Sequence, residues 1–268
     1  MNVVRRAAAF LFLALLAACG EGEDGAANEA DGEVMVFAAA SLREAMEELG
    51  AGFRRETGTR VVFNFAGSND LAHQIAATRG ADLFLSASNA WMDTVQNAGR
   101  TEDGSRRDLL ANTLVIVANT RDTSTMANPC DLARLPFKNL ALGDPEAVPA
   151  GTYAREWLWS VACEEMPLWE RVQARVAPAP DVRAALGLVL AEPRVIGIVY
   201  KTDQMAFAER TRVLYEVSGG PPIRYVLARL REGGDETATQ GFYDYLTGPQ
   251  AGEIFRRHGF TPLAAPAP

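Results

Sequence analysis

Apolar and polar positions along the chain follow two alternating patterns, short runs of strand length and longer segments with helical spacing. The run from Val34 to Ala39 is apolar throughout, as in a strand buried on both faces. Apolar residues then lie three, four, seven and eleven positions after Leu42, which is the spacing of one helix face: Ala45, Met46, Leu49 and Phe53. This succession repeats along the chain and predicts βαβ units built on parallel sheet.

The same two patterns predict the remaining elements. Strands are expected at 60–65, 82–86, 114–118, 140–142, 195–200, 213–217 and 225–230. Helices are expected at 70–77, around 92–95, and at 152–162, 182–190, 242–246 and 250–257, with Gly259 as a C-terminal cap. The roughly 236 residues from 33 to 268 contain no internal repeat and are many for one open sheet. They favour two α/β lobes with a cleft between them.

The beginning of the chain has the pattern of a secretory signal. Arg5 and Arg6 precede an apolar run, residues 7–18, that is too short to cross a bilayer. Residues 16–19 resemble the bacterial lipobox, in which a peptidase cuts before the cysteine and the thiol of Cys19 receives a diacylglyceryl group. The alternatives are an ordinary cleavage site with a free Cys19 and, for the arginine pair, twin-arginine export. We expect a signal peptide at 1–18 and lipidation at Cys19.

The segment 19–32 is rich in glycine, alanine and acidic residues and has no apolar periodicity. This composition predicts a flexible acidic tether between the lipid and the folded part. No later apolar run is long enough to span a membrane. The expected protein is therefore a globular body that contacts the membrane only through its lipid anchor.

The charge of the chain narrows the class of partner. The net charge is −8, and removal of the signal segment with Arg5 and Arg6 makes it about −10. Such a charge argues against nucleic acid and against an acidic membrane surface as partners. It does not exclude a small anion, because salt screens exposed charges beyond roughly 8 Å and a local pocket decides what binds.

Two cysteines, Cys130 and Cys163, lie within the predicted globular part. Disulfides persist in exported proteins, so we expect these two cysteines to pair. The closed loop would contribute on the order of 3 to 4 kcal/mol to stability in the chain-entropy model. Two unpaired buried thiols are the alternative.

Catalytic motifs have little support in the sequence. The only histidines, His73 and His258, each lack a second metal ligand at helical spacing. The chain has no G-x-S-x-G elbow, no phosphate-binding P-loop and no Cys/His cluster. We therefore expect no catalytic residue, no cofactor and no direct metal-ion ligand.

Four junctions between a strand and a helix carry a different chemistry. They lie at Ser41, at Ser68, at 149–152 and at 180–182. A helix N-terminus has unsatisfied N–H groups and a partial positive charge, so several of them aimed at one cleft would bind an anion without any cation. Taken singly, each junction is also an ordinary helix start, for instance a capping box of Ser41 with Glu44.

Seven segments, in order, resemble the molybdate-binding component of bacterial molybdate ABC importers. They are VFAAASLREAM at 36–46, FNFAGSNDLAHQI at 63–75, ADLFLSASNAWMD at 81–93, ALGDPEAVPAGTYA at 141–154, APAPDVRAALGLV at 177–189, GIVYKTD at 197–203 and FYDYLTGPQAGEIFRRHGFT at 242–261. The resemblance implies the two-lobed type II periplasmic binding protein fold, with a ligand cleft between lobes that close about a hinge. We place the first lobe at 33–113 with 226–268, and the second at 114–225.

The resemblance also implies a ligand set. Ser41 and Ser68 would donate hydroxyl and backbone hydrogen bonds from one lobe, Ala150 and Val182 would donate through backbone N–H from the other, and the Tyr200 hydroxyl would complete the site. Whether Gly67 or Asn69 tunes the site is open. The side chains of Arg43 and Arg183, which neighbour these positions, are expected to face outward or to lie behind the residues that touch the ligand.

The function that the resemblance implies is capture of molybdate, or of tungstate, and its delivery to a membrane permease. The protein would be a monomer in the periplasm or at the cell surface, and the oxyanion would be its only ligand. Two rivals remain, a receptor for another oxyanion such as sulfate or thiosulfate, and a secreted hydrolase with Ser41 or Ser68 as nucleophile. The hydrolase needs a base beside its serine, which His73 or His258 would have to supply.

Overall fold

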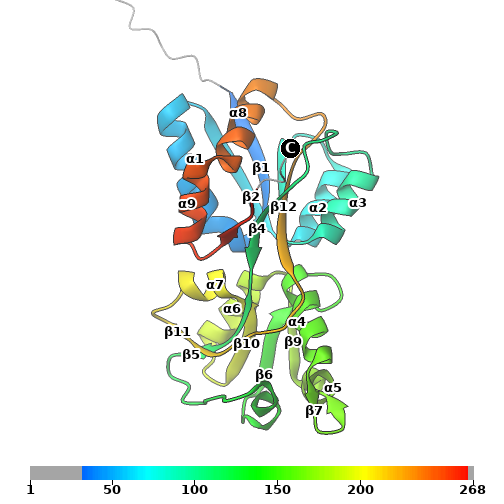
Figure 1. The fold of residues 1–268 in the computed structure, drawn as a ribbon, viewed down its shortest axis with the longest axis vertical. Coiled ribbons are helices and arrows are strands. Elements are labelled where there is room, and N and C mark those ends of the chain that lie inside the picture. Colours follow the sequence, from blue (N-terminus) through cyan, green and yellow to red (C-terminus); the bar gives the residue numbers. More distant parts are fainter. Residues whose placement is uncertain (1–31, 265–268) are drawn as a thin grey trace, which may run out of the picture.

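In a computed structural model, which describes residues 32–264, the chain forms two α/β lobes, one above the other in Figure 1. The predicted signal peptide, Cys19 and all but the last residue of the predicted tether lie outside the described residues. Each lobe has its own central sheet, with helices on both sides (Figure 1). The expectation of a two-lobed α/β fold is therefore confirmed.

The first lobe is built on a six-stranded sheet in the order β13-β4-β12-β3-β1-β2. Its strands are β1 Glu33–Ala39, β2 Arg60–Ala66, β3 Leu83–Ser86, β4 Arg107–Asn112, β12 Ile223–Arg229 and β13 Thr261–Pro262. Three helices pack on one face, α1 Arg43–Thr57, α8 Glu236–Thr247 and α9 Pro249–Arg257, and two on the other, α2 Ser68–Ala77 and α3 Asn89–Asn97 (Figure 1). The short 3-10 helix η1, Ala40–Leu42, joins β1 to α1.

The second lobe is built on a five-stranded sheet in the order β11-β5-β10-β6-β9. Its strands are β5 Leu114–Asn119, β6 Asn139–Gly143, β9 Val176–Ala179, β10 Val195–Tyr200 and β11 Thr211–Glu216. Its helices are α4 Pro149–Ser160, α5 Leu168–Val172, α6 Val182–Ala191, α7 Lys201–Ala206, and the 3-10 helices η2 Pro129–Arg134 and η3 Gln173–Arg175. A small hairpin, β7 Ala162–Cys163 with β8 Met166–Pro167, extends from it.

The chain crosses between the lobes twice, at Thr113 between β4 and β5 and at residues 217–222 between β11 and β12. The strands flanking these crossings pair antiparallel with their neighbours, whereas β1 with β2 and β3, and β6 with β9 and β10, are parallel. The prediction of parallel sheet is thus right for the βαβ strands and wrong for the crossing strands. The physical reason is that a parallel neighbour needs a long crossover, while a strand that arrives from the other lobe does not.

Most predicted elements are present with shifts at their ends, the largest at α8, which is expected at 242–246 and runs from Glu236 to Thr247. α4 begins at Pro149 rather than at residue 152, and β12 begins at Ile223, ahead of the lobe boundary expected at 226. Gly259, at φ +86°, has the left-handed conformation expected of a residue that ends a helix. β4 was not predicted, because its polar and charged start with Arg107 and Asp108 hides the strand pattern.

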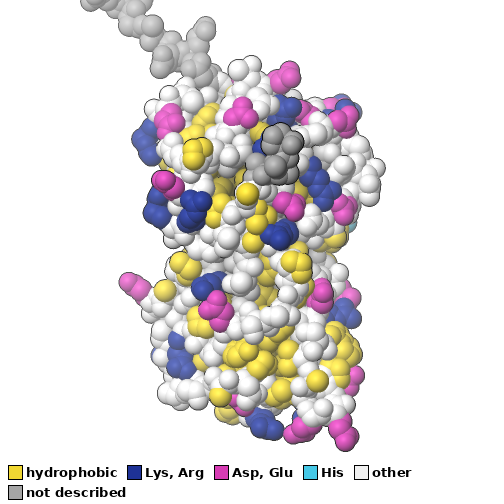
Figure 2. All heavy atoms as spheres, in the orientation of Figure 1, with side chains coloured by type: hydrophobic (Ala, Val, Ile, Leu, Met, Phe, Trp, Pro, Cys, Tyr) yellow, Lys and Arg dark blue, Asp and Glu magenta, His cyan; other side chains and the backbone are white. Residues whose placement is uncertain are grey.

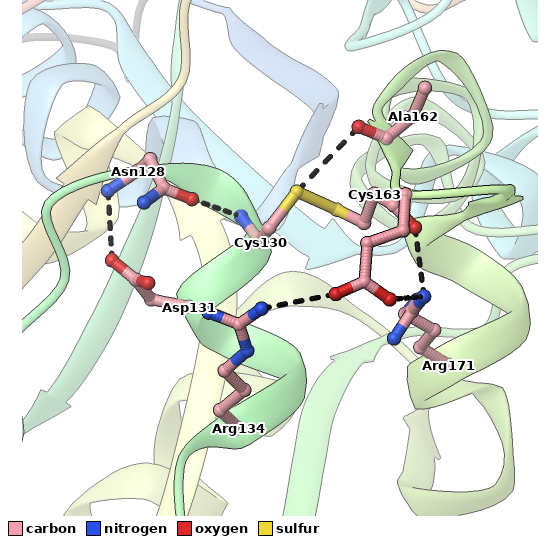
Figure 3. The surroundings of a disulfide bond; sticks show 8 residues. Asn128, Cys130, Asp131, Arg134, Ala162, Cys163 and Arg171 are labelled. Atoms are coloured by element: carbon pink, nitrogen blue, oxygen red, sulfur yellow. Dashed lines mark hydrogen bonds and ion pairs between the residues drawn. A yellow bond between two sulfur atoms is a disulfide. The ribbon is translucent and has the colours of Figure 1, made fainter.

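A disulfide joins Cys130 in η2 to Cys163 in β7, with 5.6 Å between the two Cα atoms (Figure 3). Glu164, beside it, bridges Arg134 at 3.2 Å and Arg171 at 2.7 Å, and Arg171 also donates to the Cys163 carbonyl. These contacts all lie within the second lobe. The disulfide therefore ties down the hairpin and leaves both crossing segments unconstrained.

The charged side chains of the visible face and the lengths of the helices can be compared with the expectations from the sequence. On the face in Figure 2, basic and acidic side chains alternate around yellow hydrophobic patches, and no broad basic surface is seen there. Among residues 32–264, no helix is long and apolar enough to cross a membrane. Within the same residues, no cluster of three or more His, Cys, Asp or Glu side chains could hold a metal ion.

Candidate functional site

A small cavity of about 10 Å³ lies between the two lobes. Its lining comes from both of them: Ala39, Ala40, Ser41, Ala66, Gly67, Ser68 and Ala87 from the first, and Val148, Pro149, Ala150, Asp181, Val182 and Tyr200 from the second. All five residues that the sequence singled out for an anion site are among them. The fold brings these positions together although they are spread over most of the chain.

Four helix starts converge on this cavity. Ser41 lies in η1, Ser68 is the first residue of α2, Ala150 is the second of α4 and Val182 is the first of α6. Backbone N–H groups in the first turn of a helix have no carbonyl partner within that helix. The cavity is therefore surrounded by N–H donors and by the positive ends of helix dipoles, which favour a negatively charged ligand.

Asp181 is the one acidic residue of the lining, and its carboxylate is engaged elsewhere. Its Oδ1 accepts hydrogen bonds from the N–H groups of Arg183 at 2.7 Å and Ala184 at 2.9 Å, so Asp181 caps α6 as the sequence predicted. This capping satisfies the second and third N–H groups of the helix. It leaves the N–H of Val182, the first, for the cavity.

The predicted capping box of Ser41 and Glu44 is wrong. The residue that caps η1 is Ala39, the one that caps α1 is Leu42, and neither cap has a side-chain hydrogen bond. Because the 3-10 turn holds Ser41 inside the element, its Oγ instead lies 2.8 Å from the hydroxyl of Tyr225 in β12. Ser68 is likewise no cap: the capping residue of α2 is Gly67.

The two other hydroxyl groups of the predicted ligand set are also buried. Ser68 Oγ accepts a hydrogen bond of 3.0 Å from the N–H of Ala87. The hydroxyl of Tyr200 has no hydrogen-bond partner among the described residues, although the side chain is 1% exposed. Burial raises the pKa of Tyr200 well above its ordinary value, so the phenol is a neutral donor. A buried hydroxyl without a partner is costly, and one that lines a cavity indicates a ligand.

The lobes touch each other on both sides of the cavity. Glu44 in α1 forms a bidentate ion pair with Arg183 in α6, in which Nη1 donates to Oε1 at 2.8 Å. On the other side, Trp91 Nε1 in α3 donates to the carbonyl of Ala147 at 2.8 Å. The cleft is therefore closed, with contacts between side chains of one lobe and groups of the other.

Arg183 holds a charged cluster directly behind the cavity. Its Nε lies 2.5 Å from Oδ1 of Asp203, which is fully buried. Burial raises the pKa of the Asp203 carboxyl to about 6, although the charge of Arg183 lowers it. Burial also opposes ionisation of Glu44, but hydrogen bonds and the charge of Arg183 outweigh it and leave the Glu44 pKa below its ordinary value. Arg183 thus lies behind the lining, as expected.

Arg43, the other arginine next to the predicted ligand set, faces outward. It lies over the ring of Phe65, 4.4 Å from its centroid, and pairs with Glu47 at 3.4 Å along the same helix. Its side chain is 47% exposed. Neither arginine is part of the cavity lining.

The histidines do not partner the two serines. His73 packs edge-on against Trp91, and His258 Nε2 lies 2.8 Å from Glu48 Oε2. The hydroxyl groups of Ser41 and Ser68 make the hydrogen bonds with Tyr225 and Ala87 described above. The arrangement of nucleophile and base that a serine hydrolase requires is therefore not formed by these residues.

Size alone does not locate the site. A larger hollow of about 270 Å³ lies along the crossing segments 111–114 and 217–224. Its lining consists of strand ends and connecting residues, with no helix start among them. The smaller cavity is the better candidate because polar donors from both lobes converge on it.

Sequence reasoning missed the groups that support the lining. Tyr225 lies within an apolar strand, Glu44 has the position of a cap residue, and Ala87 acts through its backbone N–H. The sequence assigns Glu44 only to a capping box, and it assigns Tyr225 and Ala87 no role at the site. Only the proximity of distant segments reveals them.

This chain is similar in sequence and in fold to known binding proteins of bacteria. The family model described as bacterial extracellular solute-binding protein matches residues 34–261. The molybdate-binding protein ModA of Escherichia coli K12 is 40% identical over 237 residues, which cover 86% of this chain and 90% of that protein. ModA of Haemophilus influenzae is 32% identical, with coverage of 87% and 91%. The solved structure of the periplasmic molybdate-binding protein of Azotobacter vinelandii has a TM-score of 0.77 at 19% identity, covers 86% of this chain and all of that one, and shares its fold.

Proposed function

Because this chain belongs to the bacterial extracellular solute-binding proteins, and is similar to their molybdate-binding members, we propose that it captures molybdate outside the cytoplasm and delivers it to the permease of an ABC importer. The observation that carries this proposal is the donor set of the cavity. N–H groups and hydroxyls from both lobes converge there, and the lining includes no lysine, arginine or histidine.

Neutral donors suit a tetrahedral dianion. Molybdate near neutral pH carries no proton and accepts hydrogen bonds at all four oxygens. Backbone N–H groups of Ser41, Ser68, Ala150 and Val182, and the hydroxyls of the two serines and Tyr200, would provide its shell. Hydrogen bonds to charged groups contribute roughly 1.5 to 3 kcal/mol each, so several of them account for sub-micromolar affinity after the cost of closure.

A cleft closed around the anion would select its ligand by size and by protonation state. Sulfate offers the same acceptors but is smaller, so donors held at the distance that suits molybdate would not all reach it. The O–H group of a protonated oxyanion would face an N–H or O–H donor of the lining, and neither group could accept a hydrogen bond from the other. Tungstate has nearly the same size and the same charge as molybdate, and we propose that the site takes it as well.

The remaining features of the proposal concern where and how the protein works. A signal peptide at 1–18 would direct export and be removed, and a lipid on Cys19 would then hold the globular body at the membrane through the tether of residues 19–32. The protein would act there as a monomer, would carry no cofactor and would perform no reaction. Its two lobes would open and close about the crossings at 113 and 217–222.

Calorimetric titration of the purified, delipidated protein with molybdate, tungstate and sulfate tests this proposal. We expect sub-micromolar binding of molybdate and tungstate with one site per chain, and little competition from sulfate. Strong binding of sulfate together with no heat from molybdate would instead identify a receptor for another oxyanion.

A further inference from the structure

The hydroxyl of Ser41 is backed by a hydrogen-bonded chain that begins at the hinge. Ser41 Oγ lies 2.8 Å from the hydroxyl of Tyr225, and Asn112 Nδ2 lies 3.2 Å from the same hydroxyl. Ser41 is 3% exposed and Tyr225 is fully buried. Each polar atom in the series Asn112, Tyr225 and Ser41 has few hydrogen-bond partners. The contacts therefore determine which group donates in each hydrogen bond.

The side-chain amide of Asn112 determines which group donates in the first of these hydrogen bonds. Its Oδ1 accepts a hydrogen bond of 2.9 Å from the backbone N–H of Thr113, which can only donate. Nδ2 must then face the other way, toward Tyr225 and toward Thr202 Oγ1 at 3.0 Å. An amide NH₂ group donates and does not accept, so the phenol oxygen of Tyr225 is an acceptor from Asn112.

The hydroxyl of Tyr225 then has one acceptor left for its proton. Ser41 Oγ is its other hydrogen-bonding neighbour, and a proton directed elsewhere in this buried site would lose its hydrogen bond. Burial also raises the pKa of Tyr225, so the phenol keeps its proton. Tyr225 therefore donates to Ser41, and the Ser41 hydroxyl retains its own proton for the cavity that it lines.

The Ser68 hydroxyl is also held as a hydrogen-bond donor, but by a backbone group. The backbone N–H of Ala87 donates to Ser68 Oγ, which leaves the Ser68 proton uncommitted. The unpartnered hydroxyl of Tyr200 is the third donor of the lining. The oxygen of each serine thus accepts a hydrogen bond from a protein group, and the hydroxyl proton of each serine is free to donate to a ligand in the cavity.

We propose that Tyr225 and Asn112 are positioning residues that hold the Ser41 hydroxyl as a hydrogen-bond donor toward a fully deprotonated oxyanion in the cavity. The proposal rests on the proposed function, because it concerns the same cavity. Asn112 is the last residue of β4 before the crossing, and its second partner, Thr202, belongs to the other lobe. The donor orientation of Ser41 is therefore tied to the arrangement of the two lobes.

A double-mutant cycle tests the role of Tyr225. Tyr225→Phe keeps the ring and removes only the hydroxyl, so the Ser41 hydroxyl is free to rotate toward other acceptors. We expect molybdate affinity, measured by calorimetry, to fall by about tenfold in the wild-type background, since a charged hydrogen bond is weakened. In the Ser41→Ala background the same substitution should change affinity by less than about twofold.

The controls separate positioning from general structural damage. Tyr225→Phe combined with Ser68→Ala should give the product of the two single losses, because Ser68 is backed by Ala87 instead. Tyr243→Phe removes another buried hydroxyl of the first lobe, one that donates to the Ser105 carbonyl at 2.6 Å, and should leave affinity unchanged. Equal losses from Tyr225→Phe with and without Ser41, or no loss at all, would overturn the proposal.

Asn112→Asp provides an independent variant that removes no hydroxyl. An aspartate carboxylate at position 112 would accept a hydrogen bond from the Tyr225 hydroxyl. The Tyr225 hydroxyl would then no longer donate to Ser41. Its cost to molybdate affinity should be larger in the wild-type background than in the Tyr225→Phe background, where only the added charge remains. Equal costs would contradict the proposal. If wild-type protein does not bind molybdate, the proposed function fails and this inference with it; if it binds and the coupling is absent, only this inference fails.

Discussion

Glu44 and Arg183 belong to different lobes and form a bidentate ion pair across the closed cleft. Each lies next to the candidate anion site, since Glu44 follows Ser41 by one helical turn and Arg183 follows Val182 directly. The Arg183 side chain is 16% exposed and that of Glu44 is 35% exposed, so water screens this pair less than a surface pair. In the proposed opening and closing of the lobes, this pair would form on closure and would stabilise the closed state with two charge-assisted hydrogen bonds.

Glu44→Gln should weaken molybdate binding without touching the cavity lining. The substitution keeps the shape of the side chain and removes its charge, so closure loses on the order of 1 kcal/mol, or about fivefold in affinity, most of it through faster release. Stopped-flow release rates and calorimetry measure the effect. Glu47→Gln is the matched control, because Glu47 pairs with Arg43 on its own helix and not across the cleft. Equal effects of the two substitutions would show that the cross-cleft pair does not stabilise closure.

Gly67→Ala should obstruct closure by steric contact. A Cβ on Gly67 would lie 2.8 Å from the carbonyl oxygen of Pro180 in the opposite lobe and would also press on Asn69 Oδ1. Such overpacking typically costs 1 to 3 kcal/mol, so we expect molybdate affinity to fall by about tenfold while the melting temperature without ligand changes little.

The control for Gly67→Ala is Gly187→Ala in α6, where an added Cβ meets no atom within 4 Å. It should leave affinity unchanged and should stabilise the helix by roughly 0.5 to 1 kcal/mol. Retention of full affinity by Gly67→Ala would mean that the lobes accommodate the methyl group at the rim of the cavity.

Asp203→Asn should change the pH dependence of stability. Burial raises the pKa of Asp203 to about 6 in the folded state, against about 3.9 for an ordinary aspartate. The folded state therefore binds more protons than the unfolded state between pH 4 and 6, so the contribution of Asp203 is fully present below about pH 4 and is lost as the pH rises through about 6.

Urea unfolding of wild-type and Asp203→Asn protein between pH 4 and 7 measures this effect. The free energy of unfolding of the wild type, relative to that of the variant, should decrease as the pH rises across this window. A difference that stays constant with pH would contradict a raised Asp203 pKa.

Removal of the disulfide should lower stability and spare binding. Replacement of Cys130 and Cys163 by alanine opens a loop with a sequence separation of 33 residues, at a cost of about 3 to 4 kcal/mol. The midpoint of urea unfolding should fall, while molybdate affinity should remain within about twofold, because the bond lies within the second lobe and away from both crossings. A large loss of affinity with intact folding would link the hairpin to the cleft.

The elements that sequence predicted best are those with one dominant pattern. β10 is a continuous apolar run and has the predicted ends, 195 and 200, while α1 carries a full helical stripe that predicts its start within one residue but stops at Phe53, four residues before the helix ends. β4 was missed because it is half exposed and begins with charged residues, and its strand pairing comes from β12, far away in the chain. The antiparallel crossings followed from the path of the chain between lobes, which local periodicity does not encode.

The sequence by itself determined the two-lobed α/β class, the approximate places of the strand-to-helix junctions and, through resemblance, the five candidate ligand positions. Local hydrophobic spacing and backbone capping chemistry act over a few residues, which is why they are readable along the chain. Only the tertiary structure decided what stands behind those positions: Tyr225 at Ser41, Ala87 at Ser68, and Arg183 between Glu44 and Asp203. These contacts join residues far apart in sequence, within one lobe for Tyr225, Ala87 and Asp203 and across the cleft for Glu44, so no pattern along a short stretch of the chain encodes them.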